Sequence, residues 1–110
     1  MANLFKNSVT GSIGTTNTRV YQTPAATVST VIGMSVSNIV TNNISVNVTI
    51  TDASATQTRY LVRNGLIVDG SSMVVVGGEQ KVVLESGDYI SVVSSAATSV
   101  DVIVSVLEIS

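Results

Sequence analysis

The sequence contains no cysteine, no histidine and no tryptophan, and it has a single phenylalanine and a single proline. Without cysteine and histidine, the chain has no disulfide, thiol or imidazole chemistry, and it lacks the usual protein ligands of zinc and haem. A general base would have to be an Asp, Glu, Lys or Tyr side chain. A Ser/Lys pair with Lys6 or Lys81 is formally possible, but no motif marks a partner serine. We therefore predict no enzymatic activity, no catalytic residues and no cofactor.

Charge is scarce as well. Charged residues make up 11% of the chain, against about 25% in an average soluble domain. The net charge of −2 gives no basic patch that would attract nucleic acid or an anionic membrane. Apolar runs stay far below the roughly 20 residues that span a bilayer, and the N-terminus does not resemble a secretory signal. We expect a soluble protein, made in a host cytoplasm, with no nucleic-acid or membrane partner.

Valine, serine and threonine make up nearly half of the 110 residues, and apolar and polar residues alternate over long stretches. The alternation over residues 44–51 is strict, which is typical of a strand with one buried face. Valines alternate in the same way over residues 100–106, but Ile103 and Leu107 make the second face partly apolar. That strand is expected to be covered on both sides or to lie at a contact.

Turn signals recur about every 8–14 residues, a spacing that favours an all-β sandwich or barrel. Asn64-Gly65 and the 85–88 link predict β-hairpins, and Gly33 predicts a bulge or a point of close approach. Asp69-Gly70 and Gly77-Gly78 predict further turns. We predict about eight strands, with one of the short ones spurious, among residues 18–22, 27–38, 43–51, 57–63, 66–68, 72–76, 81–85, 89–94 and 99–109.

Residues 1–16 have a different texture, with two glycines, small polar residues and no sustained period. This composition favours an extended N-terminal arm, and four isolated apolar residues are available to anchor it: Leu4, Phe5, Val9 and Ile13. We predict an arm over residues 1–16 and a single β-sandwich domain over residues 17–110.

Three groups of residues invite a functional interpretation. Carboxylates at strand ends and turns could hold Ca²⁺ at a loop cluster, but the regular spacing of a calcium loop is missing and turn chemistry explains them. We therefore predict no metal site. These carboxylates are Asp52, Asp69, Glu85 and Asp88.

Gly77-Gly78 leads into a strand rather than a helix, which favours a turn over a phosphate loop. The Arg59, Tyr60 and Arg63 group favours a solvated face or a subunit contact over binding of a nucleic-acid strand.

The scarcity of charge is more informative than any of these groups. Free monomers normally carry a surface that is about 25–35% charged, whereas this surface must consist largely of hydroxyl, amide and exposed apolar groups. Such a surface suits burial in an assembly, because few charges must be desolvated. We expect self-association into a homo-oligomer, possibly a trimer.

Several stretches resemble small virion proteins of tailed bacteriophages, especially cyanophages and other marine phages. The resemblance spans about residues 17–110 and is carried by strand-and-turn texture. The segments are VYQTPA (20–25), VIGMSVSN (31–38), YLVRN (60–64), GSSMVVVGGEQKVVLESGD (70–88) and VDVIVSVLEI (100–109). The family implies a jelly-roll-like antiparallel β-sandwich and a structural place on the virion, and it carries over no catalytic residue.

From this resemblance we expect a virion structural protein, first of all a capsid decoration or cement protein on the outside of the head. The expected partners are further copies of the chain and the major capsid protein, or neck and tail proteins. A neck, collar or tail-fibre component is the alternative. A carbohydrate-binding β-sandwich is a third reading, with Tyr21, Tyr60 and Tyr89 as its aromatic platforms.

Overall fold

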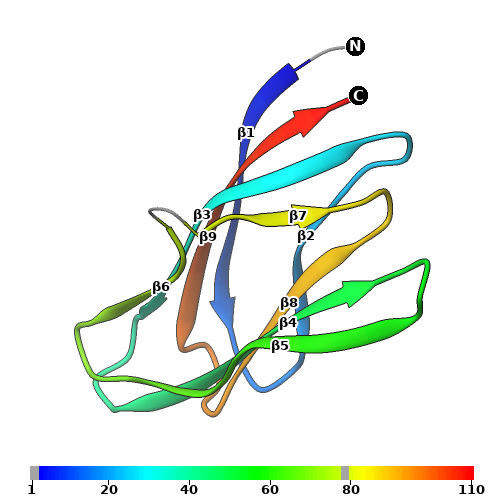
Figure 1. Cartoon of the computed structure of the whole chain (residues 1–110). Coiled ribbons are helices and arrows are strands. Elements are labelled where there is room, and N and C mark those ends of the chain that lie inside the picture. The colour runs from blue at the N-terminus through cyan, green and yellow to red at the C-terminus, as the bar shows by residue number, and fades with distance from the viewer. Residues whose placement is uncertain (1–2, 78–79) are drawn as a thin grey trace.

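The computed structural model describes residues 3–77 and 80–110, which form nine strands in two facing sheets (Figure 1). Its principal extents are 45 × 26 × 22 Å. The strands are β1 (Asn3–Ile13), β2 (Thr18–Gln22), β3 (Val28–Asn38), β4 (Ile44–Asp52), β5 (Gln57–Ile67), β6 (Ser72–Val76), β7 (Val82–Leu84), β8 (Tyr89–Ser94) and β9 (Val100–Ile109).

All strand pairs are antiparallel. Sheet A has the order β1-β9-β3-β6, with β7 also paired to β3, and sheet B has the order β2-β8-β4-β5. β6 pairs with residues 34–37 of β3 and β7 with residues 29–31, so these two strands form one interrupted edge strand. Counted in this way the chain has eight strands that pass repeatedly from one sheet to the other, which is the jelly-roll arrangement. The predicted single all-β, jelly-roll-like sandwich is confirmed.

The core lies between the sheets, where the period-two pattern places it. Ile44, Val46 and Val48 of β4 are buried, and Ile50 is half-buried near the β4–β5 turn. The four alternating valines of β9 are fully buried in the opposite sheet: Val100, Val102, Val104 and Val106. Strict alternation therefore identified the inner faces of both sheets, because each apolar face must be covered by the other.

The hairpin predicted at Asn64-Gly65 is wrong. β5 runs through both residues, so the two predicted strands at 57–63 and 66–68 are one strand. The left-handed φ of 52° at Asn64 produces an irregularity in the pairing with β4 instead of a turn, and the Asn64 N–H donates to Asn47 Oδ1 (2.7 Å). Gly65 is required by packing, since a Cβ there would lie 2.5 Å from Val62 Cγ1.

The turn predicted over residues 85–88 is present, but it does not make a hairpin. β7 belongs to sheet A and β8 to sheet B, so this turn carries the chain across the sandwich. Gly87 has a φ of 85°, and the Asp88 N–H donates to the Glu85 carbonyl (3.0 Å). The turn at Asp69-Gly70 crosses from β5 to β6 in the same way, with Gly70 at a φ of 75°. Local sequence specifies the bend but does not specify which sheet the next strand joins.

At the predicted Gly77-Gly78 turn, the Gln80 N–H donates to the Gly77 carbonyl (3.1 Å), and Gly78 lies outside the described residues. The bulge predicted at Gly33 is confirmed, because the pairing of β3 with β9 shifts between Val31 and Gly33.

Residues 3–13 are hydrogen bonded along β9 as strand β1, from Asn3 opposite Ile109 to Ile13 opposite Val100. Most of β1 is exposed and only Ile13 is buried. Because β1 is an edge strand with little buried surface, it lacks the apolar alternation that marks the other strands. An arm-like role of residues 1–16 towards neighbouring molecules stays a prediction.

Candidate assembly surface

The outer face of sheet A is rich in exposed apolar side chains. In β9, the residues between the buried valines point outwards, and the register aligns them with outward residues of β1. Ile103 is opposite Val9, and Leu107 is opposite Phe5. On the other side of β9, β3 contributes shorter side chains, and the edge strand adds Val74 and Val83.

Several of these side chains are strongly exposed for their type: Phe5 73%, Val74 71%, Val9 68%, Val83 63% and Ile103 49%. Among the described outward residues of this face, the charged one is Asp101 near the end of β9, where its Oδ1 accepts the Ser12 N–H (2.9 Å). We call this surface the sheet A face. Contiguous exposed apolar area of this kind marks interaction sites on soluble proteins.

The outer face of sheet B is more polar, although Leu66, opposite Ser45, is 64% exposed on it. One row across its strands consists of Arg19, Ser91, Thr49 and Tyr60. The next row includes Thr51 and Thr58, whose hydroxyls are 2.9 Å apart. Arg59, Tyr60 and Arg63 are all exposed on β5, and the Arg63 guanidinium lies 5.8 Å from the centre of the Tyr60 ring. The register places Tyr60 opposite the outward Thr49 but Arg59 opposite the half-buried Ile50, so the three exposed residues do not share one face. Whether they form a solvated face or a subunit contact stays a prediction.

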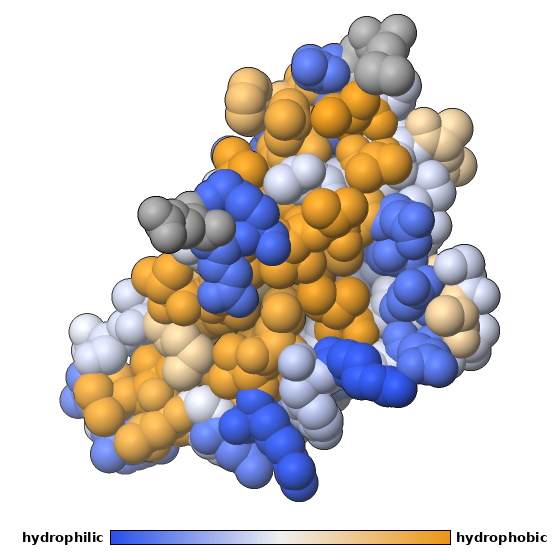
Figure 2. Space-filling model, viewed as in Figure 1, coloured by the Kyte–Doolittle hydropathy of each residue, from blue (hydrophilic) through white to orange (hydrophobic). Residues whose placement is uncertain are grey.

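A second apolar surface lies along the edge of the sandwich where β5 and the β6/β7 strand face each other. Figure 2 shows hydrophobic residues gathered in a band from β7 towards β5. β4, β5, β6 and β7 contribute partly buried apolar residues that pack against the core: Ile50, Leu61, Val62, Met73, Val75 and Val82.

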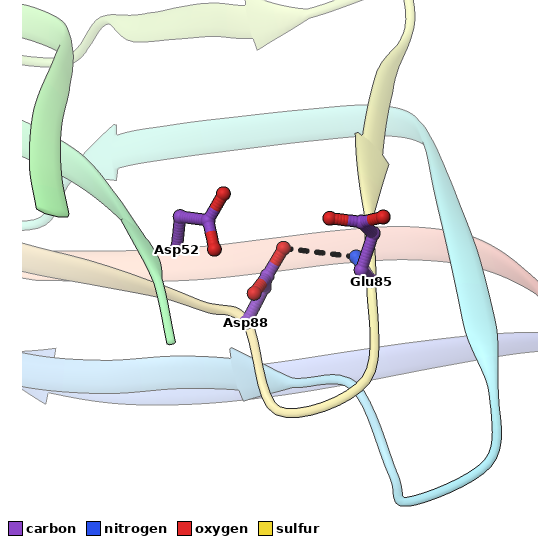
Figure 3. Close-up of side chains that lie close together, drawn as sticks. All are labelled: Asp52, Glu85 and Asp88. Atoms are coloured by element: carbon purple, nitrogen blue, oxygen red, sulfur yellow. Dashed lines mark hydrogen bonds between the residues drawn. The ribbon is translucent and has the colours of Figure 1, made fainter. Parts of the chain in front are cut away.

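The predicted loop carboxylates partly converge. Asp52, Glu85 and Asp88 each have a carboxylate oxygen within 4.8 Å of the others (Figure 3), whereas Asp69 follows β5 in the turn to β6. Asp88 is buried, and both of its oxygens are used: Oδ1 accepts the Ala53 N–H (3.0 Å) and Oδ2 accepts the Glu85 N–H (2.9 Å). Asp88 thereby ties the β7–β8 turn to the end of β4.

Asp52 holds the neighbouring β4–β5 turn. Its Oδ1 accepts hydrogen bonds from the Ala55 N–H (3.1 Å) and the Ser54 hydroxyl (2.9 Å). These hydrogen bonds lower the pKa of Asp52 below its usual value of 3.8, and the bond from the Ala55 backbone has the largest effect. Two of the three carboxylates are therefore engaged in turn structure, which accounts for their presence without a metal ion.

A buried polar cluster was not predicted. The Tyr21 hydroxyl donates to Glu108 Oε2 (2.5 Å) and lies 2.6 Å from Ser29 Oγ, and Lys6 Nζ approaches Glu108 Oε2 at 3.9 Å. Burial and the hydrogen bond to Glu108 raise the pKa of Tyr21 above its usual 10.0. Glu108 continues the inward alternation of the β9 valines. This position in the alternation was the sequence signal that could have predicted its burial. Because Tyr21 is buried, it cannot serve as an exposed platform for a sugar.

Tyr89 is covered on one side, since the Arg19 guanidinium lies 3.7 Å from its ring centre. In the described ranges, no helix is long and apolar enough to cross a membrane.

No protein-family model and no curated protein match the sequence. Among solved structures, the chain is similar to a protein of Bacillus endospore appendages, a family of disulfide-linked pili. That likeness has a TM-score of 0.57 and 12% identity, and it covers 96% of this chain and 86% of the other. At such identity it shows a shared fold.

Weaker likenesses involve viral proteins. A chain of infectious bursal disease virus Gx strain aligns with 96% of this chain and 28% of its own length, at a TM-score of 0.49 and 9% identity. A pentameric capsid protein isolated from metagenomic phage sequences aligns with 94% of this chain and 58% of its own length, at a TM-score of 0.40 and 20% identity. This chain therefore spans less than two thirds of either viral chain.

Proposed function

We propose that this protein is a structural subunit of a phage virion, first of all a decoration or cement protein on the outside of the capsid. The observation that carries the proposal is the sheet A face. It exposes Phe5, Val9 and Ile103, and few charged residues surround them. A free monomer gains nothing from such a face, whereas an assembly buries it without desolvating charges. We propose a structural and not a catalytic role.

Two further features support this proposal. The stretches that resemble tailed-phage virion proteins include β3, β6 and β9, which carry much of the sheet A face. The endospore-appendage protein with a similar fold forms pili, an analogy at the level of the fold alone. The proposed partners are further copies of this chain together with the major capsid protein, and the proposed location is the virion. A neck, collar or tail position is the alternative.

The test is to locate the chain on purified particles by cryo-electron microscopy and to count its copies. A decoration protein is expected in hundreds of copies spread over the head, and a neck component in about a dozen at one vertex, as capsid and neck symmetry require. Purified particles that lack the chain would refute the proposal.

We also propose that residues 1–16 act as an arm towards a neighbouring subunit or another virion protein. A truncation of residues 1–10 removes most of β1 but keeps Ile13, the buried residue of this strand. We expect the truncated chain to fold and to be incorporated poorly into particles. If it fails to fold, β1 is a required part of the sandwich and the arm interpretation is wrong.

A further inference from the structure

Gly33 is a glycine that the isolated chain does not need. Its φ is not positive, unlike that of Gly70 and Gly87. A Cβ added at Gly33 would meet only the Val76 carbonyl oxygen, at an ordinary 3.9 Å, whereas at Gly65 it would collide with Val62 at 2.5 Å. Gly33 lies at the bulge of β3, but its φ is one that a residue with a side chain can adopt. Since internal packing leaves room as well, the missing side chain fits a close approach from outside.

The position of Gly33 on the sheet A face fits this explanation. Gly33 pairs with Ser105 of β9, which in turn pairs with Asn7 of β1. This row of small side chains runs between the row with Phe5 and Leu107 and the row with Val9 and Ile103. A depression of about 310 Å³ lies over the Asn7 and Ser105 part of this row, lined by Phe5, Lys6, Asn7, Ile32, Ser105 and Val106. Gly33 does not line it but lies next to it, because it pairs with Ser105.

The face therefore carries a projection and a hollow side by side. Phe5 is the only phenylalanine in the sequence, and its side chain is 73% exposed at the rim of the depression. A surface with both features can be complementary to itself. A two-fold axis beside the row places each projection over the hollow of the other copy, as in an isologous dimer.

We propose that the sheet A face packs against the same face of a second copy, with Phe5 of each molecule filling the depression beside Gly33 of the other. This inference rests on the proposed structural role and names the partner of that same face. The contact would be a sheet-on-sheet packing with the two outer faces about 10 Å apart.

Area and charge both favour a second copy as the occupant. Four strands spaced by about 4.8 Å, each about ten residues long at about 3.3 Å per residue, give a face of about 600 Å². Two such faces bury about 1,200 Å², the lower end of stable specific interfaces. Asp101 lies near the end of β9 and not in the central row. Lys6 lines the depression, and its charge is balanced within its own molecule by Glu108 Oε2 at 3.9 Å. A face with so few charges also offers little to a strongly charged partner.

The first experiment measures self-association by sedimentation velocity over a range of concentrations. Phe5→Ala removes the projection, and Gly33→Leu adds a bulky side chain to the row of small residues beside the depression. Each is expected to weaken association at least about tenfold. Tyr60→Ala, which truncates an exposed aromatic ring on sheet B, is the matched control and should change association less than about twofold. Thermal melting of each variant checks that the monomer still folds. Equal association of all three variants and the parent chain would overturn the proposal.

The second experiment uses the absence of cysteine in the chain. A Ser105→Cys variant places one thiol in the central row of the sheet A face, and a Thr49→Cys variant places one on the outer face of sheet B. Mild oxidation or a short bifunctional maleimide is expected to cross-link the Ser105→Cys molecules efficiently and the Thr49→Cys molecules poorly. The reverse preference, or equal yields, would contradict face-to-face packing.

The outcomes separate this inference from the proposed function. A parent chain that stays monomeric at high concentration while Phe5→Ala and Gly33→Leu reduce its incorporation into particles would overturn the second-copy proposal, because another virion protein then covers the face. A dimer that depends on Phe5 and Gly33, with no chain found on particles, would support the inference and refute the virion role.

Discussion

The two sheets have equivalent inner faces and different outer faces. Inside, the alternating apolar residues of β4 and β9 are buried against each other's sheets. Outside, sheet A exposes Phe5, Val9 and Ile103 in several rows, whereas the outer face of sheet B carries mainly polar residues such as Thr49 and Arg19, with Leu66 as an exposed apolar exception. The comparison teaches that folding accounts for the inner pattern of both sheets but for the outer pattern of sheet B only. The apolar outer pattern of sheet A needs a second explanation, and contact with another molecule supplies it.

The largest expected effect tests the equivalence of the inner faces. Val48→Asp in sheet B and Val102→Asp in sheet A each bury an unpaired carboxylate at a fully buried position, which costs several kcal/mol. Because a domain of this size has only about 5–15 kcal/mol of stability, both variants should unfold or fail to express. Thr49→Asp, on the outer face beside Val48, should lower the melting temperature far less. If Val48→Asp and Thr49→Asp melted alike, the assigned faces of β4 would be wrong.

A smaller effect is expected where the core is polar. Tyr21→Phe removes the hydroxyl that links Glu108 and Ser29, and leaving the buried acceptor short of a donor should cost about 1–3 kcal/mol. Chemical denaturation measures this loss of unfolding free energy. Tyr89→Phe, which changes a tyrosine outside the cluster, is the control.

The same cluster predicts a response to alkali. The pKa of Tyr21 is raised in the folded protein, so the neutral hydroxyl is favoured there and its stabilisation is complete below the unfolded-state pKa of about 10. As the pH rises above 10 the unfolded state ionises first and stability falls. Tyr21→Phe should flatten this part of the stability profile, and an unchanged slope would contradict the burial of the hydroxyl.

On the outer faces, single substitutions should barely affect the stability of the monomer. Ile103→Thr, in the middle of the sheet A face, is expected to change the free energy of unfolding by about 0.5 kcal/mol or less, with Thr49→Ser on sheet B as its counterpart. Chemical denaturation at low protein concentration keeps self-association out of the measurement. A loss of several kcal/mol for Ile103→Thr would mean that the apolar outer residues of sheet A stabilise the monomer. The interpretation that they serve a contact with another molecule would then be wrong.

The smallest effect concerns the β4–β5 turn. Asp52 has a lowered pKa in the folded protein, so its stabilisation is present above about pH 3.8 and disappears as the pH falls below that value. The difference in melting temperature between the parent chain and Asp52→Asn should be small at neutral pH and vanish near pH 2. A difference that persists at pH 2 would show that the carboxylate charge is not its source.

The sequence predicted the sandwich well wherever one face of a strand is buried. The alternation of β4 and β9 specifies both the strand and its orientation, because a shift by one residue would expose the apolar set. β1 escaped prediction as a strand because most of its residues are exposed and period two has no buried face to mark. The Asn64-Gly65 signal was misleading, since a left-handed residue serves a bulge as well as a turn. Glu108 was overlooked as a core residue because carboxylates are rarely buried. Its position in the alternation of β9 nevertheless places it on the inner face.

The assembly surface was only half visible in the sequence. Ile103 and Leu107 already gave β9 a partly apolar second face, and this strand was expected to be covered on both sides or to lie at a contact. Phe5 and Val9 joined that face only through the register of β1 with β9. A pairing between residues about 100 positions apart depends on the whole topology, so no local pattern could reveal it. The meaning of Gly33 likewise needed the structure, in which only the Val76 carbonyl oxygen lies near the missing Cβ, at 3.9 Å.

The two ends of the chain leave the molecule side by side. Asn3 is paired with Ile109 at one end of sheet A, and Figure 1 shows both termini at the same end of the molecule. A short linker could therefore join them, with new ends opened in the exposed β4–β5 turn, to give a circular permutant that keeps every strand pair. For the same reason, a peptide or protein fused to either terminus would be displayed at one common pole. Two fusions, one at each terminus, would therefore lie close together on the same side of the molecule.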